Sequence, residues 1–331
     1  MSDSAVTEST TTQQQDEVGR IRTVGEAIVE SVGRVIDGKA DAIRTALMVL
    51  LAEGHLLVED VPGVGKTVLA KALAASVGGS VSRIQFTSDL LPSDVTGVNI
   101  YDQRSGSFSF SPGPVFANIV ISDEINRASP KTQSALLECM AEGQVTVDGT
   151  TRMLARPFTV VATQNPVDME GTYALPEAQR DRFMARIAMG YPSESAERDM
   201  LRTRGTHDPM ADVRPVVTVE ELCHMIEVVH AVHISSAVEA YIVGIARATR
   251  EHPDLALGAS PRATLHLASA ARARAALDGR AYVTPDDVAA LATSVLAHRL
   301  VPVARGLGAA SDEAVREIVR RVVAAMPVPA T

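Results

Sequence analysis

The stretch EDVPGVGKT, from Glu59 to Thr67, contains most of a phosphate-binding loop. The loop pattern is G-x-x-x-x-G-K-[ST] between a strand and a helix, and Gly65, Lys66 and Thr67 match it. Successive backbone N–H groups at a helix N-terminus form a concave site for an anion. Lys66 would neutralise the β- and γ-phosphates of a nucleotide, and the Thr67 hydroxyl would hold Mg²⁺. The alternative is an inert strand–turn–helix. The residues that we expect to contact a nucleotide are Pro62, Gly63, Val64, Gly65, Lys66, Thr67 and Val68.

Asp60 departs from the loop pattern, because it occupies the position of the first glycine. A carboxylate near a triphosphate is unfavourable unless it points away or is screened by Mg²⁺. The first position lies at the strand end, farther from the phosphates than Gly65, and Asp tolerates turn geometries well. We therefore expect Asp60 to tune nucleotide affinity, in either direction, without abolishing it.

Polar residues follow two further apolar runs. The run NIVISD ends in Asp123, and Glu124 comes next. At the carboxyl edge of a parallel sheet, where ligands bind, Asp123 would hold Mg²⁺ and Glu124 would activate the attacking water. Asn165 ends the run FTVVATQN and would position that water or contact the γ-phosphate. Solvated turns are the alternative for each group, but their combination with the loop predicts a metal–phosphate site.

These groups require a sheet that brings strand ends together. The runs HLLVED, NIVISD and FTVVATQN lack polar alternation, which is typical of strands buried on both faces of a parallel sheet. Helical patterns separate them, so residues 18–191 are predicted to form an α/β domain. Residues 192–331 show helical patterns only and predict a smaller helical domain. Residues 1–17 are polar and of low complexity, which predicts a disordered tail.

Composition narrows the function classes. The 331 residues carry a formal charge of −9, and no cluster of Lys and Arg with interleaved aromatics occurs, which disfavours a general nucleic-acid binder. No apolar run approaches the roughly 20 residues that span a bilayer. The N-terminus lacks a signal-peptide pattern, so we expect a cytoplasmic protein. Cys139 and Cys223 lack metal-ligand spacing and are expected to be buried or half-buried thiols.

The chain also contains four longer stretches that are specific in combination: RIQFTSDLLPSDVTG, GPVFANIVISDEINRASPKTQSALLECMAEGQVTVDG, VVATQNPVDMEGTYALPEAQRDRF and GASPRA. Together they resemble the MoxR family of AAA+ ATPases, over nearly everything from Val18 to the C-terminus. The resemblance implies a P-loop AAA+ αβα core followed by a helical lid. It also implies two inserted β-hairpins, one within residues 89–111 and one in QVTVDGTTRML.

The resemblance assigns roles to the residues already singled out. Lys66 and Thr67 match the Walker A motif, Asp123 and Glu124 match Walker B, and Asn165 matches sensor 1. The implied cofactors are ATP and Mg²⁺.

Two arginines gain roles in the same way. Arg182, in DRF, matches the arginine finger, and Arg262, in SPRA, matches sensor 2. Arg180 stands where the family usually has Leu, so it is a second candidate for the finger or a surface charge. Independently of the family, Ser260 and Pro261 are typical of an N-cap and a first helical residue, which places Arg262 in a first helical turn. A cation there opposes the helix dipole, which indicates a nearby anion such as an ATP phosphate.

The resemblance further implies an ATP-hydrolysing homo-oligomeric ring, as a hexamer, with ATP between core and lid and Arg182 entering the neighbouring subunit's site. It implies chaperone-like remodelling or maturation of protein complexes with a partner that contains a von Willebrand factor A domain. A non-hydrolysing scaffold and a DNA-translocating or magnesium-chelatase-like motor are the alternatives. The expected hairpins carry few charges, which argues against DNA, and no N-K-x-D string indicates a GTPase.

Overall fold

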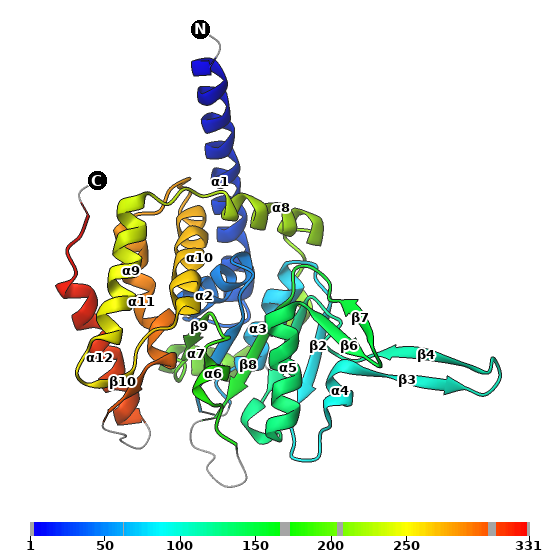
Figure 1. Cartoon of the computed structure of the whole chain (residues 1–331). Coiled ribbons are helices and arrows are strands. Elements are labelled where there is room, and N and C mark those ends of the chain that lie inside the picture. Colours follow the sequence, from blue (N-terminus) through cyan, green and yellow to red (C-terminus); the bar gives the residue numbers. More distant parts are fainter. Residues whose placement is uncertain (1–2, 62, 166–172, 204–207, 304–308, 330–331) are drawn as a thin grey trace.

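The computed structural model describes residues 3–61, 63–165, 173–203, 208–303 and 309–329. A five-stranded sheet lies at its centre (Figure 1). The strands of this sheet are in the order β2, β5, β8, β1, β9. These strands span Val81–Gln85, Ile119–Asp123, Thr159–Gln164, Leu56–Glu59 and Ala185–Ile187. All neighbouring strands run parallel, so their carboxyl ends meet at one edge of the sheet.

The two faces of the sheet belong to two hydrophobic cores. Successive strand residues point to opposite faces, so Val58 packs in one core and Leu57 in the other. The first core includes helices α2 (Ala40–Leu51) and α3 (Lys66–Ser76), and the second includes α5 (Pro130–Glu142). The chain therefore forms the expected α/β sandwich, with helices on both faces of a parallel sheet.

The three predicted strands are β1, β5 and β8, at the centre of the sheet. The sequence did not indicate the two edge strands. In β2 only Ile84 is buried, so the segment lacks the continuous apolar run of a central strand. Strand β9 is only 3 residues long and pairs with β1 alone, which is too short for a pattern.

Helix α1 (Asp3–Gly33) replaces the expected disordered tail over residues 3–17. Val18 and Ile21 are buried, and the side chains of Gln14 and Gln15 donate hydrogen bonds to Ala231 O (2.9 Å) and Gly279 O (2.8 Å) of the helical domain. Once packing has fixed part of a helix, adding further residues to its end requires little free energy, because each added residue gains one backbone hydrogen bond. The polar composition therefore did not indicate the helical state.

The C-terminal part is a helical lid, as expected. Its helices are α7 (Glu194–Thr203), α8 (Val219–His230), α9 (Ser236–Arg250), α10 (Pro261–Leu277), α11 (Pro285–Leu296) and α12 (Ala309–Ala325), with 3₁₀ turns η2 (Pro209–Asp212) and η3 (Ala297–Arg299). A short antiparallel ribbon, β10 (Leu255–Leu257) with β11 (Val301–Pro302), corrects the expectation of a purely helical domain. Helices of the lid share the first core with α1 and α2, so lid and core are packed together.

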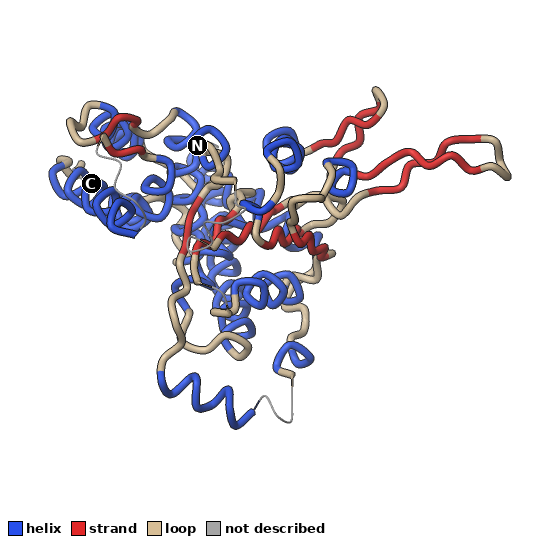
Figure 2. The backbone as a smooth tube through the Cα atoms, turned by 90° about the horizontal axis from the view of Figure 1, so that it is seen from below, coloured by secondary structure: helices blue, strands red, loops and turns tan. Residues whose placement is uncertain are grey.

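Both expected hairpins are present and project from the same side of the body (Figure 2). Strands β3 (Gly97–Asp102) and β4 (Ser107–Pro112) follow the short helix α4 (Pro92–Thr96), and β6 (Gln144–Val147) pairs with β7 (Thr150–Met153). Asn99 and Asp148 connect the two hairpins through a hydrogen bond of 2.7 Å.

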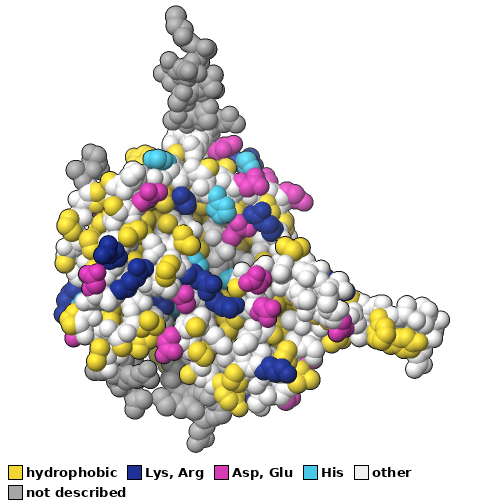
Figure 3. Space-filling model, in the orientation of Figure 1, with side chains coloured by type: hydrophobic (Ala, Val, Ile, Leu, Met, Phe, Trp, Pro, Cys, Tyr) yellow, Lys and Arg dark blue, Asp and Glu magenta, His cyan; other side chains and the backbone are white. Residues whose placement is uncertain are grey.

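The surface carries charges of both signs over the body, whereas hydrophobic side chains stand out on the projecting hairpin (Figure 3). Tyr101 and Phe108 contact each other there with tilted rings whose centroids are 5.1 Å apart, and they are 53% and 72% exposed. Cys139 is buried and Cys223 half-buried, both as free thiols. Among the described residues, no helix is long and apolar enough to cross a membrane.

Candidate nucleotide site

The loop between β1 and α3 has the backbone that an anion cradle requires. Gly63 and Gly65 have φ of 83° and 92°, in the left-handed region that favours glycine. Gly65 is the N-cap of α3, so the unpaired N–H groups of the first helical turn begin directly after it. Val64 and Val68 are half-buried against the first core and fix the loop to the body. Pro62 lies outside the described residues.

Lys66 reaches across the end of the sheet. Its Nζ donates to the carbonyl oxygens of Asp60 and, at 3.3 Å, of Gln164. Burial lowers the pKa of Lys66, while the nearby carboxylates of Asp60, Glu124 and Asp123 oppose that shift. The ammonium thus lies between the ends of β1 and β8, where phosphate oxygens would be stronger partners than the carbonyls.

The carboxylate of Asp60 binds backbone amides rather than facing an open loop. Its Oδ1 accepts from Val61 N at 2.8 Å, and its Oδ2 accepts from Met189 N at 2.7 Å and Gly190 N at 2.5 Å. Met189 and Gly190 follow β9 and lead towards the lid. Asp60 therefore connects the phosphate loop to the segment between core and lid, which explains how a carboxylate is tolerated at this position.

Thr67 and Asp123, the two residues expected to hold the metal, lie together. The Thr67 hydroxyl is 3.0 and 3.1 Å from the two carboxylate oxygens of Asp123, whose side chain is 6% exposed. Arg83 Nε, at 2.7 Å, and the Thr163 hydroxyl, at 3.2 Å, also donate to Asp123. The described residues contain no group of three or more His, Cys, Asp or Glu that could hold a metal. One carboxylate and one hydroxyl fit Mg²⁺, which usually takes its remaining ligands from water and phosphates.

Glu124 has a left-handed backbone conformation, which turns its side chain away from the direction it would have if β5 continued. Its φ of 56° is left-handed, which is uncommon for a residue other than glycine and is concentrated at functional sites. The Glu124 N–H donates to the Thr163 hydroxyl at 3.0 Å. Its Oε2 accepts from Gln85 Nε2 at 3.1 Å and from Arg127 at 2.9 Å. The carboxylate is therefore held at the sheet edge while remaining 35% exposed.

Asn165 follows β8 at the same edge and is only 6% exposed. The carbonyl oxygen of the preceding residue, Gln164, accepts a hydrogen bond from Lys66. Residues 166–172 lie outside the described chain. The structure thus brings together the loop, the Asp–Glu pair and Asn165. It adds Arg83 and Gln85, which were missed because β2 was not recognised, and Thr163, which lies inside the predicted strand β8 rather than after it.

A cavity of about 350 Å³ lies beside the loop. It is lined by Gly33, Arg34, Val35, Ile36, Asp37, Lys39, Gly63, Val64, Gly65, Val68, Pro192, Ala196, Met200 and Pro209. Most of these side chains are apolar, and Lys39 closes one wall by donating to Tyr191 O at 2.9 Å. Its size and apolar lining suit the heterocyclic base of a nucleotide. The sequence patterns did not indicate the walls of this cavity at 33–39 and 192–209.

The three arginines occupy different places. Arg182 is half-buried and donates to Leu137 O in α5, within its own core. Arg180 lies 3.9 Å from Glu177 and lines a separate cavity of about 320 Å³ next to Gln164.

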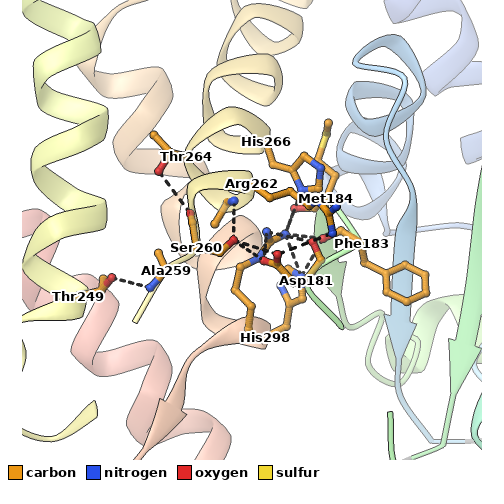
Figure 4. Close-up of polar contacts among 12 residues, drawn as sticks. Asp181, Phe183, Met184, Thr249, Ala259, Ser260, Arg262, Thr264, His266 and His298 are labelled. Carbon is orange, nitrogen blue, oxygen red and sulfur yellow. Dashed lines mark hydrogen bonds and ion pairs between the residues drawn. The ribbon is translucent and has the colours of Figure 1, made fainter. Parts of the chain in front are cut away.

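Arg262 is the second residue of α10, after the N-cap Ser260 and Pro261, as predicted, and its side chain is 46% exposed. Asp181 is the anion that lies near it, 4.0 Å away (Figure 4). Arg262 is not among the described residues that line the cavity beside the loop. Arg262 therefore lies with the segment that carries Arg182, and its expected contact with ATP remains a prediction.

Comparison with known proteins agrees with this geometry. Residues 55–185 match the model of the ATPase family associated with various cellular activities (AAA), and residues 247–318 match the AAA lid domain. The chain is 51% identical over 296 residues to "Uncharacterized protein YeaC" of Bacillus subtilis (strain 168), covering 89% of this chain and 92% of that protein. It is 44% identical over 290 residues to "Chaperone MoxR1" of Mycobacterium tuberculosis, covering 85% and 76%. The crystal structure of a putative ATPase from Cytophaga hutchinsonii superposes with a TM-score of 0.87 at 36% identity, covering 97% and 99%. The chain belongs to the MoxR family of AAA+ ATPases.

Proposed function

We propose that this protein hydrolyses Mg-ATP and uses the resulting conformational change to remodel or mature protein complexes. The observation that carries the proposal is the convergence of Lys66, the Thr67–Asp123 pair and Glu124 at one edge of the sheet. Each group is the type that phosphoryl transfer to water requires. Lys66 and Thr67 follow β1, and Asp123 and Glu124 lie at the end of β5.

The residues divide the chemistry among them. Lys66 exchanges its carbonyl partners for phosphate oxygens, and the loop N–H groups cradle the remaining phosphate charge. Bound Mg²⁺, held by Thr67 and Asp123, supplies charge neutralisation of the phosphates. Glu124 accepts a proton from the attacking water, and Asn165 orients that water. The cavity beside the loop takes the adenine.

Hydrolysis is proposed to require a second copy of the chain. Arg182 donates to Leu137 O of its own core, and an arginine supplied by a neighbour can raise the rate by about 10³–10⁵. A closed head-to-tail ring, as a hexamer in the cytoplasm, gives each subunit one finger and one site. Glu124 and Asn165 are both present at the sheet edge, which disfavours the non-hydrolysing scaffold.

The class of substrate is proposed to be protein. The projecting hairpin exposes Tyr101 and Phe108, and its turn carries only Asp102 and Arg104 as charges. A neutral aromatic surface suits contact with a polypeptide better than with a phosphate backbone. The relative named as a chaperone supports the same class. A partner that contains a von Willebrand factor A domain is part of the proposal.

The test is Mg-ATP hydrolysis as a function of protein concentration for wild type, Glu124→Gln and Arg182→Ala, with Arg180→Ala as a matched control. We expect wild-type specific activity to rise with concentration and both key variants to lose about 10²-fold or more. Arg180→Ala should lose far less. If wild type binds ATP but hydrolyses none at any concentration, the proposal is wrong and the scaffold function replaces it.

A further inference from the structure

Asp181, the residue directly before Arg182, is bound by three side chains of the lid (Figure 4). The Ser260 hydroxyl lies 2.8 and 2.9 Å from its two carboxylate oxygens. Arg299 donates to its Oδ1 at 2.9 Å, and Arg262 lies 4.0 Å from its Oδ2. Ser260 caps α10 and Arg299 ends η3, so two separate lid elements converge on one carboxylate of the core.

The lid also bonds the main chain on both sides of Arg182. Arg299 donates to the carbonyl oxygens of Asp181 (3.4 Å), Phe183 and Met184 (3.3 Å). The His298 ring lies 3.0 Å from Phe183 O. The bonds of Arg299 therefore bracket Arg182 and connect η3 directly to the backbone of this segment.

Arg299 and Asp181 form an ion pair that is largely buried. The side chain of Arg299 is 2% exposed and that of Asp181 is 17% exposed. Burial lowers the pKa of Arg299 to about 10, an effect that the charge of Asp181 opposes. Apolar residues of similar volume often stabilise a protein as well as a buried ion pair does. A hydrogen-bonded ion pair differs in that it fixes one orientation of the two packed elements relative to each other. The Asp181–Arg299 pair is therefore better suited to fixing the position of the lid relative to the core than to stabilising the fold.

We propose that Asp181 is a positioning residue through which the lid sets the place of Arg182. When the lid changes orientation, Ser260 and Arg299 move Asp181, and Arg182 moves with it towards or away from the neighbouring subunit's nucleotide. The inference rests on the proposed function, in which Arg182 acts in the neighbour's site. It adds that the lid of one subunit controls hydrolysis in the next.

The first experiment measures Mg-ATP hydrolysis by the full-length Asp181→Asn protein at concentrations where wild type is fully active. We expect kcat to fall about tenfold or more with KM for ATP changed less than about threefold, because the variant's own phosphate loop is intact. Asp287→Asn is the matched control. Asp287 is 2% exposed and pairs with Arg280 at 2.7 Å entirely within the lid. It should lower the melting temperature similarly but leave kcat within about twofold.

A mixing experiment separates positioning from damage within the same subunit. In a large excess of Glu124→Gln subunits, each Asp181→Asn subunit receives a finger from a neighbour whose Asp181 is intact. We expect its turnover to recover to that of wild-type subunits diluted into the same excess. If it stays low, the defect lies in the subunit's own site and the inference is wrong.

Two further outcomes are distinguishable. If Asp181→Asn hydrolyses ATP at the wild-type rate while Arg182→Ala is inactive, the finger stands but Asp181 does not position it. If Arg182→Ala is itself fully active, the trans finger of the proposed function fails instead. Should Asp181→Asn not fold, Ser260→Ala keeps the Asp181–Arg299 pair and should lower kcat in the same direction. Its control is Ser235→Ala, which removes the N-cap of α9, a helix whose cap does not contact Asp181.

Discussion

Replacing Asp60 by Asn tests whether this residue serves the phosphates or the segment that leads to the lid. The change keeps the shape of the side chain and removes its charge. In the structure the carboxylate accepts hydrogen bonds from the N–H groups of Val61, Met189 and Gly190. An Asn side chain has one acceptor oxygen, so its amide nitrogen must face at least one of these donors.

The expected loss in the free energy of unfolding follows from those three hydrogen bonds. If the Asn oxygen replaces Oδ2, it keeps the bonds to Met189 and Gly190 without charge assistance, and the amide of Val61 loses its partner. Charged hydrogen bonds contribute about 1.5–3 kcal/mol, against about 0.5–1.5 kcal/mol for neutral bonds. Because Asp60 is half-buried and water screens part of the effect, we expect the free energy of unfolding to fall by about 2–3 kcal/mol.

The assay is urea denaturation combined with titration of a fluorescent ATP analogue. Asp94→Asn is the control, because Asp94 is exposed and accepts one backbone bond, from Leu91 N at 2.9 Å. It should lose less than about 1 kcal/mol. For Asp60→Asn we expect ATP affinity to change less than about threefold, which corresponds to less than about 0.7 kcal/mol. Unchanged stability with about tenfold tighter ATP binding would refute the reasoning, since the carboxylate would then act on the phosphates.

Three other predictions concern the same region. Gly65→Ala forces a side chain onto a residue with φ of 92°, so we expect ATP affinity to fall about tenfold or more; Gly19→Ala, whose new Cβ meets no atom within 4 Å, should bind normally in the same titration. Burial lowers the pKa of His55 from 6.5 to about 4, so the unfolded chain binds the proton first and stability falls as pH drops through this range. His55→Gln should flatten that fall in denaturant melts at pH 7 and pH 5, and equal slopes for both proteins would contradict it. Arg83 lies 2.7 Å from Asp123, so Arg83→Gln should lower the Mg²⁺ concentration for half-maximal hydrolysis several-fold. An increase in that Mg²⁺ concentration would contradict this prediction and would mean that Arg83 orients the Asp123 carboxylate for the metal.

Much of the central sheet and of the site could be predicted from local pattern. Strands β1, β5 and β8 are buried on both faces and are therefore continuously apolar in the sequence, which makes them visible. The polar residues that follow them, such as Asp123 and Asn165, meet because parallel strands end at one edge. The edge strands β2 and β9 were missed, because partial burial or short length removes the apolar run on which the prediction depends.

The sequence by itself determined which groups are available and in what order. The glycines fix the left-handed turns of the loop, and the spacing of Lys66 and Thr67 places both at the start of α3. These are local properties, since backbone conformation and side-chain direction depend on neighbouring residues.

Only the tertiary structure decided the partners of the charged groups. Asp60 binds the amides of Met189 and Gly190, and Asp181 binds Arg299, although these residues are far apart in the chain. No periodicity encodes such a choice, because a carboxylate can accept from any donor that folding brings within reach. The same physics explains why a polar N-terminal segment became helix α1: its state depends on where Val18 and Ile21 are buried, which only packing settles.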